Sequence, residues 1–266
     1  MDFRFKAGDA PMLLSMPHVG TDIPDEVAAT MAPCALAKAD TDWHLAELYE
    51  AADRLGVSTL AARWSRYVID LNRPPENTNL YPGMDTTGLC PVDTFGRESL
   101  YQEGRVPDEA EVKRRLERYW QPYHTQLRAE LVRLLALHGR VVLWDAHSIA
   151  SQVPRFFEGR LPDLNFGTAE GKSCDPGLEN AVVDVARAHD RFSIAVNGRF
   201  KGGHITRFYG QPKEGVHAIQ LEMCQCLYMN EAPPFEYRPE VAAEVQPLLA
   251  DMMRAALDWV RAGGRA

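Results

Sequence analysis

The stretch Arg140-Val-Val-Leu-Trp-Asp-Ala-His-Ser148 decides the fold, because it is an apolar, β-branched run that stops abruptly at polar residues. Such a run predicts a buried strand of a mostly parallel sheet. Asp145 and His147 lie near its end, and residues two apart on a strand point to the same face. Ligands of open α/β sheets bind at the carboxyl ends of strands. Because imidazole is the commonest metal ligand, the pair predicts a metal site, with a plain polar strand end as the alternative.

The rest of the chain alternates between strand and helix patterns, which favours an α/β fold. Expected strands cover 12–16, 57–62, 67–71, 192–196 and 217–222, and expected helices cover 24–31, 42–55, 107–138, 177–189 and 239–263. Two polar stretches, 72–107 and 151–176, remain as loops, and long loops of this kind are often functional. Pro122 is expected to kink the longest helix, and His124 and His138 are expected at its surface or its end.

The composition is that of an ordinary globular protein of 266 residues, with 45% hydrophobic and 25% charged residues. A formal net charge of −8 argues against a nucleic-acid surface, because phosphate contacts need clustered Lys and Arg. No apolar run approaches the roughly 20 residues that span a bilayer, and the N-terminus lacks a signal-peptide pattern. We therefore expect no membrane association and a cytoplasmic location. The odd number of cysteines, five, argues against a disulfide framework.

Three apolar strand patterns end in groups that suit catalysis, namely His18, the Asp145/His147 pair and Glu222. The strand ends on one edge of a sheet converge in space, so these side chains are expected to share a site. A catalytic zinc keeps three protein ligands and one open position, and it activates a water at that position. His18 and His147 are the expected ligands, and Glu222 is the expected general base.

The third metal ligand is sought in the segment Ala39-Asp-Thr-Asp-Trp-His44, at an expected helix start. Helix capping explains acidic residues there equally well. Two histidines that bind a metal nevertheless need a carboxylate partner. Asp42 is our choice, and Asp40 and His44 remain as alternatives. Zinc is the expected ion, although two histidines and one carboxylate accept several divalent ions.

Two arginine-bearing segments indicate a small anionic substrate, because guanidinium groups bind carboxylates in bidentate fashion. The first runs from Arg66 to Asn72 and Arg73 along an expected strand. The second is the glycine-rich segment 197–210, in which Arg199 and Arg207 flank Gly202-Gly203. The alternatives are surface salt bridges for the first segment and a solvated basic loop for the second.

Taken together, these residues resemble the N-formylglutamate deformylases (N-formylglutamate amidohydrolases) of bacterial histidine degradation. The resemblance runs from about Met16 to Glu231, so we expect a single catalytic domain over residues 1–266. It is carried by an ordered set of short motifs: Pro17-His18-x-Gly20-Thr21, Thr41-Asp42-Trp43, Ser65-Arg66-Tyr-Val-Ile-Asp70-Leu-Asn72-Arg73, Asp145-Ala-His147-Ser148, Gly202-Gly203-x-Ile-Thr206-Arg207 and Gln220-Leu-Glu222.

The family looks related to zinc carboxypeptidases and aspartoacylases, which implies a three-layer αβα domain around a mostly parallel mixed sheet. Those relatives take their first two ligands from a His-x-x-Glu pair, whereas Thr21 stands at the Glu position here. This departure places the second ligand at Asp42. By the same likeness Arg66 stabilises the oxyanion, while Asn72 and Arg73 hold a substrate carboxylate. His204 stands where the family is expected to have a large aromatic residue.

The resemblance implies hydrolysis of N-formyl-L-glutamate to L-glutamate and formate, the last step of a histidine degradation pathway. A metal-activated water attacks the formyl carbon, Glu222 acts as general base, and Asn72, Arg73 and Arg207, with Arg199 beside them, bind the glutamate carboxylates. Two alternatives stay open. One is an aspartoacylase-like amidase of another N-acyl acidic amino acid, and the other is a non-catalytic protein that binds an acidic metabolite.

Overall fold

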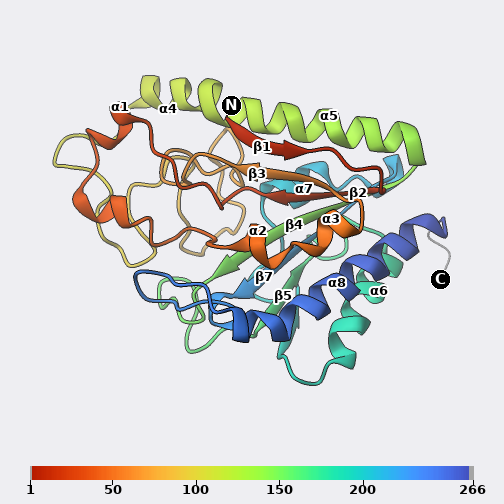
Figure 1. Cartoon of the computed structure of the whole chain (residues 1–266). Coiled ribbons are helices and arrows are strands. Elements are labelled where there is room, and N and C mark those ends of the chain that lie inside the picture. The colour runs from red at the N-terminus through yellow and green to blue at the C-terminus, as the bar shows by residue number, and fades with distance from the viewer. Residues whose placement is uncertain (1, 264–266) are drawn as a thin grey trace.

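The computed structural model describes residues 2–263, and its centre is a seven-stranded mixed sheet with the order β1-β3-β2-β4-β7-β5-β6 (Figure 1). Strands β2, β3, β4 and β7 are parallel, whereas β1 and β5 run antiparallel to their neighbours β3 and β7. The strands are β1 Phe3–Lys6, β2 Met12–Met16, β3 Ser58–Ala62, β4 Val141–Ile149, β5 Leu164–Gly167, β6 Ile194–Val196 and β7 Val216–Cys224. The expected α/β fold with a mostly parallel mixed sheet is confirmed.

Helices cover both faces of the sheet and make three layers (Figure 1). One face packs against α4 (Glu109–Arg115), a π-helical turn (Leu116–Trp120), α5 (Gln121–His138) and α7 (His204–Tyr209). The other face packs against α2 (Leu45–Leu48), α3 (Ala51–Arg54), α6 (Pro176–Ala188) and α8 (Pro239–Arg261). The remaining helical turns are α1 (Asp25–Ala28) and the 3-10 turns Pro33–Ala37, Pro212–Glu214 and Gln225–Leu227. Among residues 2–263, no helix has the length and apolarity needed to cross a membrane.

Strands β4 and β7 are fully buried because helices cover both of their faces. This explains the continuous apolar run at the start of β4, whereas β7 also buries the polar residues His217 and Gln220. Their register pairs Val141 with Val216 and, at the far end, His147 with Glu222. Strand β2 joins β4 on the other side, with Ser15 opposite Asp145. The chain leaves β2 at Met16, so His18 emerges at the same edge of the sheet as His147 and Glu222.

The segment 65–73 is not a strand, so this expectation was wrong. The chain turns here instead, with hydrogen bonds from Val68 N–H to Ser65 O and from Arg73 N–H to Asp70 O. The Ser65 hydroxyl and the Asp70 carboxylate also accept from backbone N–H groups two residues ahead, which stabilises turns in place of a ladder. The apolar residues of this segment are buried under α4 and α5 rather than within the sheet.

Three expected helices also differ in detail. The helix expected over 24–31 is limited to Asp25–Ala28, and the one expected over 42–55 is split into α2 and α3. His44 precedes α2 in a left-handed conformation, with φ of 61°, which an uninterrupted helix does not allow. The helix expected over 107–138 is interrupted by the π-helical turn Leu116–Trp120, which ends two residues before Pro122.

Candidate active site

His18, Asp42 and His147 form a compact buried group at the carboxyl edge of the sheet, and each offers a ligand atom within 4.8 Å of the others. The Asp42 Oδ2 atom lies 3.3 Å from His147 Nδ1 and 3.8 Å from His18 Nδ1. Local hydrogen bonds fix this carboxylate, because Asp42 N–H donates to His18 O and Asp42 Oδ2 accepts from Ser148 N–H. Nitrogen and carboxylate donors in this number suit a zinc site.

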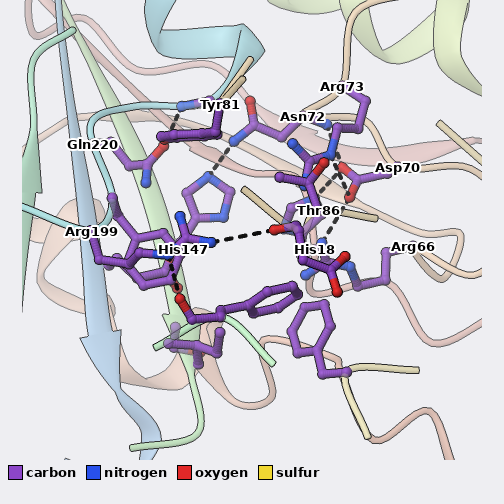
Figure 2. Close-up of a pocket in the computed structure, with 18 residues that line it drawn as sticks. His18, Arg66, Asp70, Asn72, Arg73, Tyr81, Thr86, His147, Arg199 and Gln220 are labelled. Atoms are coloured by element: carbon purple, nitrogen blue, oxygen red, sulfur yellow. Dashed lines mark hydrogen bonds and ion pairs between the residues drawn. The ribbon is translucent and has the colours of Figure 1, made fainter. Parts of the chain in front are cut away.

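In both His18 and His147 the Nε2 atom, which is the ring nitrogen turned away from Asp42, lies near a second carboxylate, as in many histidine metal sites. His18 Nε2 lies 2.7 Å from Asp70 Oδ1 (Figure 2). His147 Nε2 lies 3.2 Å from Asp145 Oδ1 and 2.9 Å from the Asn72 amide nitrogen. The buried Asp145 Oδ1 has no hydrogen-bond partner among the described residues, so it is free to accept an Nε2 proton. His18 can therefore present an unprotonated Nδ1 to a cation. For His147 this requires Nε2 to direct its proton to Asp145, although the Asn72 N–H donors, fixed by the bond from Ile205 N–H to Asn72 Oδ1, also face Nε2. The donor set of the group fits a divalent cation.

The two alternatives for the third ligand are engaged elsewhere. Asp40 Oδ2 accepts from Phe95 N–H at 2.9 Å. His44 bonds to the Glu47 carboxylate at 2.9 Å and to the Phe235 carbonyl at 2.8 Å. The described part of the chain thus brings Asp42, and neither Asp40 nor His44, to the two histidines.

Glu222 lies beside this group on β7, directly opposite His147 on β4. It is buried, and burial raises the pKa of its carboxyl to about 8, although the neighbouring His147 acts in the opposite direction. A carboxyl whose pKa lies near neutrality both takes up and releases a proton easily, which suits a general base that later becomes an acid.

A cleft lined by His18, His147 and Glu222 opens here, and three of the predicted arginines line it as well. Arg199 lies on one side of the cleft, while Arg66 and Arg73 lie on the other (Figure 2). Arg66 pairs with Asp70 Oδ2 at 2.7 Å and stacks on the Phe95 ring. The buried Nε of Arg73 lies 3.9 Å from Asp70 Oδ2, within ion-pair distance, but it has no hydrogen-bond partner among the described residues. Donors left unpaired in a buried cleft call for an anionic ligand.

Arg199 is held by aromatic rings rather than by a carboxylate. Its guanidinium lies 5.3–5.7 Å from the ring centroids of Tyr81, Phe156 and Phe200. Its hydrogen bonds go to the backbone carbonyls of Phe156, at 2.7 Å, and Asp85, at 3.5 Å. Burial lowers the pKa of Arg199, which reflects the cost of keeping this charge away from water.

Arg207 and Asn72 are placed differently from the other predicted substrate ligands. Arg207 does not line the cleft. It donates to the Gly202 carbonyl at 2.7 Å and lies over the Tyr81 ring. Asn72 lines the cleft, but its amide already binds His147, Asp145 and the Ile205 N–H. The backbone here requires both glycines, since Gly202 has φ of +108° and a Cβ on Gly203 would strike Asn72.

Sequence reasoning assigned no role to Asp70 or to the aromatic residues around Arg199. Asp70 is nearly inaccessible at 1% exposure, and it contacts His18 and Arg66 at 2.7 Å each. Burial alone would raise the pKa of Asp70, but His18 and Arg66 together hold it well below its usual range. Its spacing of four residues from Arg66 was the available signal. His204 is buried among rings, and its Nε2 has no partner among the described residues.

Comparisons with known proteins agree with this geometry. Residues 10–229 match the family model of N-formylglutamate amidohydrolase. The chain is 49% identical to the N-formylglutamate deformylase of Pseudomonas aeruginosa, over 97% of this chain and 96% of that protein. It is 48% identical to the N-formylglutamate deformylase of Pseudomonas putida, over 96% of this chain and 95% of that protein.

Solved structures show the same architecture. An N-formylglutamate amidohydrolase from Ralstonia eutropha superposes with a TM-score of 0.83 at 27% identity, and the match covers 98% of each chain. A gene product of Agrobacterium tumefaciens superposes with a TM-score of 0.73 at 21% identity, over 96% of this chain and 94% of that one. The second likeness concerns the fold alone.

Proposed function

The chain belongs to the N-formylglutamate amidohydrolase family, and on that basis we propose that it hydrolyses N-formyl-L-glutamate to L-glutamate and formate. The observation that carries the proposal is the convergence of His18, Asp42, His147 and Glu222 at one arginine-lined cleft. By the same likeness we propose histidine degradation as the metabolic setting and the cytoplasm as its location.

We propose that His18 Nδ1, Asp42 Oδ2 and His147 Nδ1 hold a divalent cation, with zinc as the expected ion. Such an ion, when bound, lowers the pKa of water and polarises a carbonyl. Asp70 and Asp145 would orient the two rings from behind, and they would keep the Nε2 protons away from the ligand atoms.

The catalytic steps follow from the positions of Glu222 and Arg66. Glu222 removes a proton from the attacking water as the water oxygen bonds to the formyl carbon. Arg66, fixed by Asp70 at 2.7 Å, donates to the oxyanion that forms on the formyl oxygen. Glu222 then returns the proton to the amine nitrogen as the carbon–nitrogen bond breaks. An oxyanion donor of this kind contributes about 2.7–4 kcal/mol to lowering the barrier.

We assign the two glutamate carboxylates to Arg73 and Arg199, which approach the cleft from opposite sides. Among the described residues neither guanidinium donates a hydrogen bond to a carboxylate, since Arg73 Nε has no hydrogen-bond partner and Arg199 donates to backbone carbonyls. Asn72 and Arg207, which we expected to bind substrate directly, fit a supporting role better. Asn72 orients His147, and Arg207 holds the Gly202 carbonyl and the Tyr81 ring.

The first test is formate release from N-formyl-L-glutamate, with and without a chelator and with zinc added back. Metal-dependent release supports the proposal. The closest rival is a hydrolase of other N-acyl acidic amino acids, and faster turnover of N-acetyl-L-glutamate than of the formyl substrate would favour it. Binding of glutamate with no turnover of either substrate, with zinc present, would instead favour a non-catalytic binder.

A further inference from the structure

The backbone carbonyls of Leu71, Asn72 and Arg73, next to the cleft, each accept a hydrogen bond from a donor elsewhere in the fold. The Leu71 carbonyl accepts from His124 Nε2 at 2.9 Å, and the Asn72 carbonyl accepts from His204 N–H at 3.2 Å. The Arg73 carbonyl accepts from the Trp120 indole N–H at 3.1 Å. Because this segment is not a strand, no sheet ladder satisfies these carbonyls, and buried carbonyls need donors from elsewhere.

The two side-chain donors form one rigid unit. The rings of Trp120 and His124 stack with centroids 3.6 Å apart and an interplanar angle of 18°. His124 is 3% exposed, contrary to the surface position expected for it. Its Nδ1 lies 3.0 Å from the Tyr209 hydroxyl. Since a carbonyl only accepts, Nε2 of His124 carries the proton and Nδ1 accepts from Tyr209.

The π-helical turn ends at Trp120, immediately before the helix that carries His124. One extra residue in a turn offsets the two flanking helical faces by about 100°, and such turns recur at functional sites. Within this turn the Tyr119 hydroxyl contacts Glu26, whereas the Trp120 indole contacts the Arg73 carbonyl. The π-helical turn thus contains Trp120, the residue whose indole reaches the Leu71–Arg73 backbone.

The held segment carries two groups of the cleft. Asn72 contacts His147 through its amide, and Arg73 presents its guanidinium to the cleft. Neither Trp120 nor His124 lines the cleft itself. We propose that Trp120 and His124 are positioning residues that clamp the Leu71–Arg73 backbone and thereby set where Arg73 meets a substrate carboxylate. The substrate in this proposal rests on the proposed function.

The test is the steady-state kinetics of Trp120→Phe on N-formyl-L-glutamate with zinc. Phenylalanine keeps a ring to stack on His124 but has no N–H for the Arg73 carbonyl. We expect KM to rise about tenfold or more, with kcat within about threefold, because the lost group positions binding rather than chemistry. Trp64→Phe is the matched control, since it removes an indole N–H that contacts Asp2, and its KM should stay within about twofold.

A double-mutant cycle separates positioning from a general loss of structure. In an Arg73→Ala background, Trp120→Phe should raise KM by less than about twofold, because the group it positions is gone. Equal KM increases in both backgrounds would overturn the proposal. If Trp120→Phe does not fold, His124→Gln and His124→Leu replace it. Glutamine can still donate to Leu71 and should restore most of the KM lost with leucine, and equal defects in the two would also overturn the proposal.

The two proposals fail in different ways. No turnover of N-formyl-L-glutamate by the unmutated protein would overturn the proposed function and the clamp together. Normal turnover by the unmutated protein, with an unchanged KM in Trp120→Phe, would overturn the clamp alone.

Discussion

Replacing Asp70 by asparagine should damage folding and metal binding at once, because one buried carboxylate serves several parts of the site. Asp70 contacts His18 Nε2 and Arg66 Nη2 at 2.7 Å each, and its Oδ1 accepts from Asn72 N–H at 2.9 Å. Asparagine keeps the shape but removes the charge, which leaves Arg66 buried without its counter-ion. Breaking a buried pair in this way costs about 3–5 kcal/mol of unfolding free energy.

The second effect is on the cation, since Asp70 orients a ligand ring from behind. Loss of such an outer partner typically weakens metal binding about 10- to 100-fold. Urea unfolding in chelator measures the stability loss, and competition with a chromophoric chelator measures zinc affinity. Asp53→Asn is the matched control, because Asp53 forms an exposed pair with Lys6, 2.9 Å apart, and should cost less than about 1 kcal/mol. If Asp70→Asn matched this control in stability and kept wild-type zinc affinity, the reasoning would be refuted.

The remaining predictions concern catalysis, substrate binding and pH. Glu222→Gln should lower kcat about 10²- to 10⁴-fold while zinc content stays unchanged, as measured by metal analysis alongside turnover; a loss of only a few-fold would exclude the general base. Arg199→Ala should raise KM for N-formyl-L-glutamate about tenfold or more but hardly change the KM of an analogue in which the carboxylate that Arg199 binds is an amide. Burial lowers the pKa of His124 to about 3, so the folded state favours neutral imidazole. Stability should be highest above pH 6.5 and fall as pH decreases from 6.5 toward 3, by about 2 kcal/mol at pH 5, and His124→Gln should lack this component in urea titrations at pH 5 and 7.5. Chelation should weaken the binding of L-glutamate in calorimetry as well as abolish turnover; full-strength binding to the metal-free protein would contradict this.

The sequence predicts the central strands well because their signal is local. A short, mostly apolar run that ends in polar residues identifies β2, β4 and β7, and parallel packing then brings their carboxyl ends together. The same reasoning fails over 65–73, where equally apolar residues are buried by helices that come from a distant part of the chain. An apolar pattern in the sequence indicates that a segment is buried, but it does not distinguish a buried turn from a buried strand.

The candidate site shows the same limit. His18, His147 and Glu222 follow from their places at strand ends. The choice of Asp42 over Asp40 depends on how the loop after His18 folds back, and only the hydrogen bond from Asp42 N–H to His18 O reveals that path. The different positions of Arg199 and Arg207 depend on Tyr81, which arrives from a loop more than a hundred residues earlier.

The charges around the cleft explain why metal and substrate binding should be coupled. Four buried carboxylates lie in or beside the metal-binding group, those of Asp42, Asp70, Asp145 and Glu222, whereas three guanidinium groups line the cleft, those of Arg66, Arg73 and Arg199. Burial raises the pKa of Glu222 to about 8, which favours its neutral form, so without a cation the three aspartates only match the three guanidinium groups, and Asp70 already pairs with Arg66. A dianionic substrate would then meet no excess of guanidinium charge over aspartate charge, in a chain whose net charge is already −8. A divalent cation would add two positive charges beside the cleft, and these would help Arg73 and Arg199 to attract the substrate.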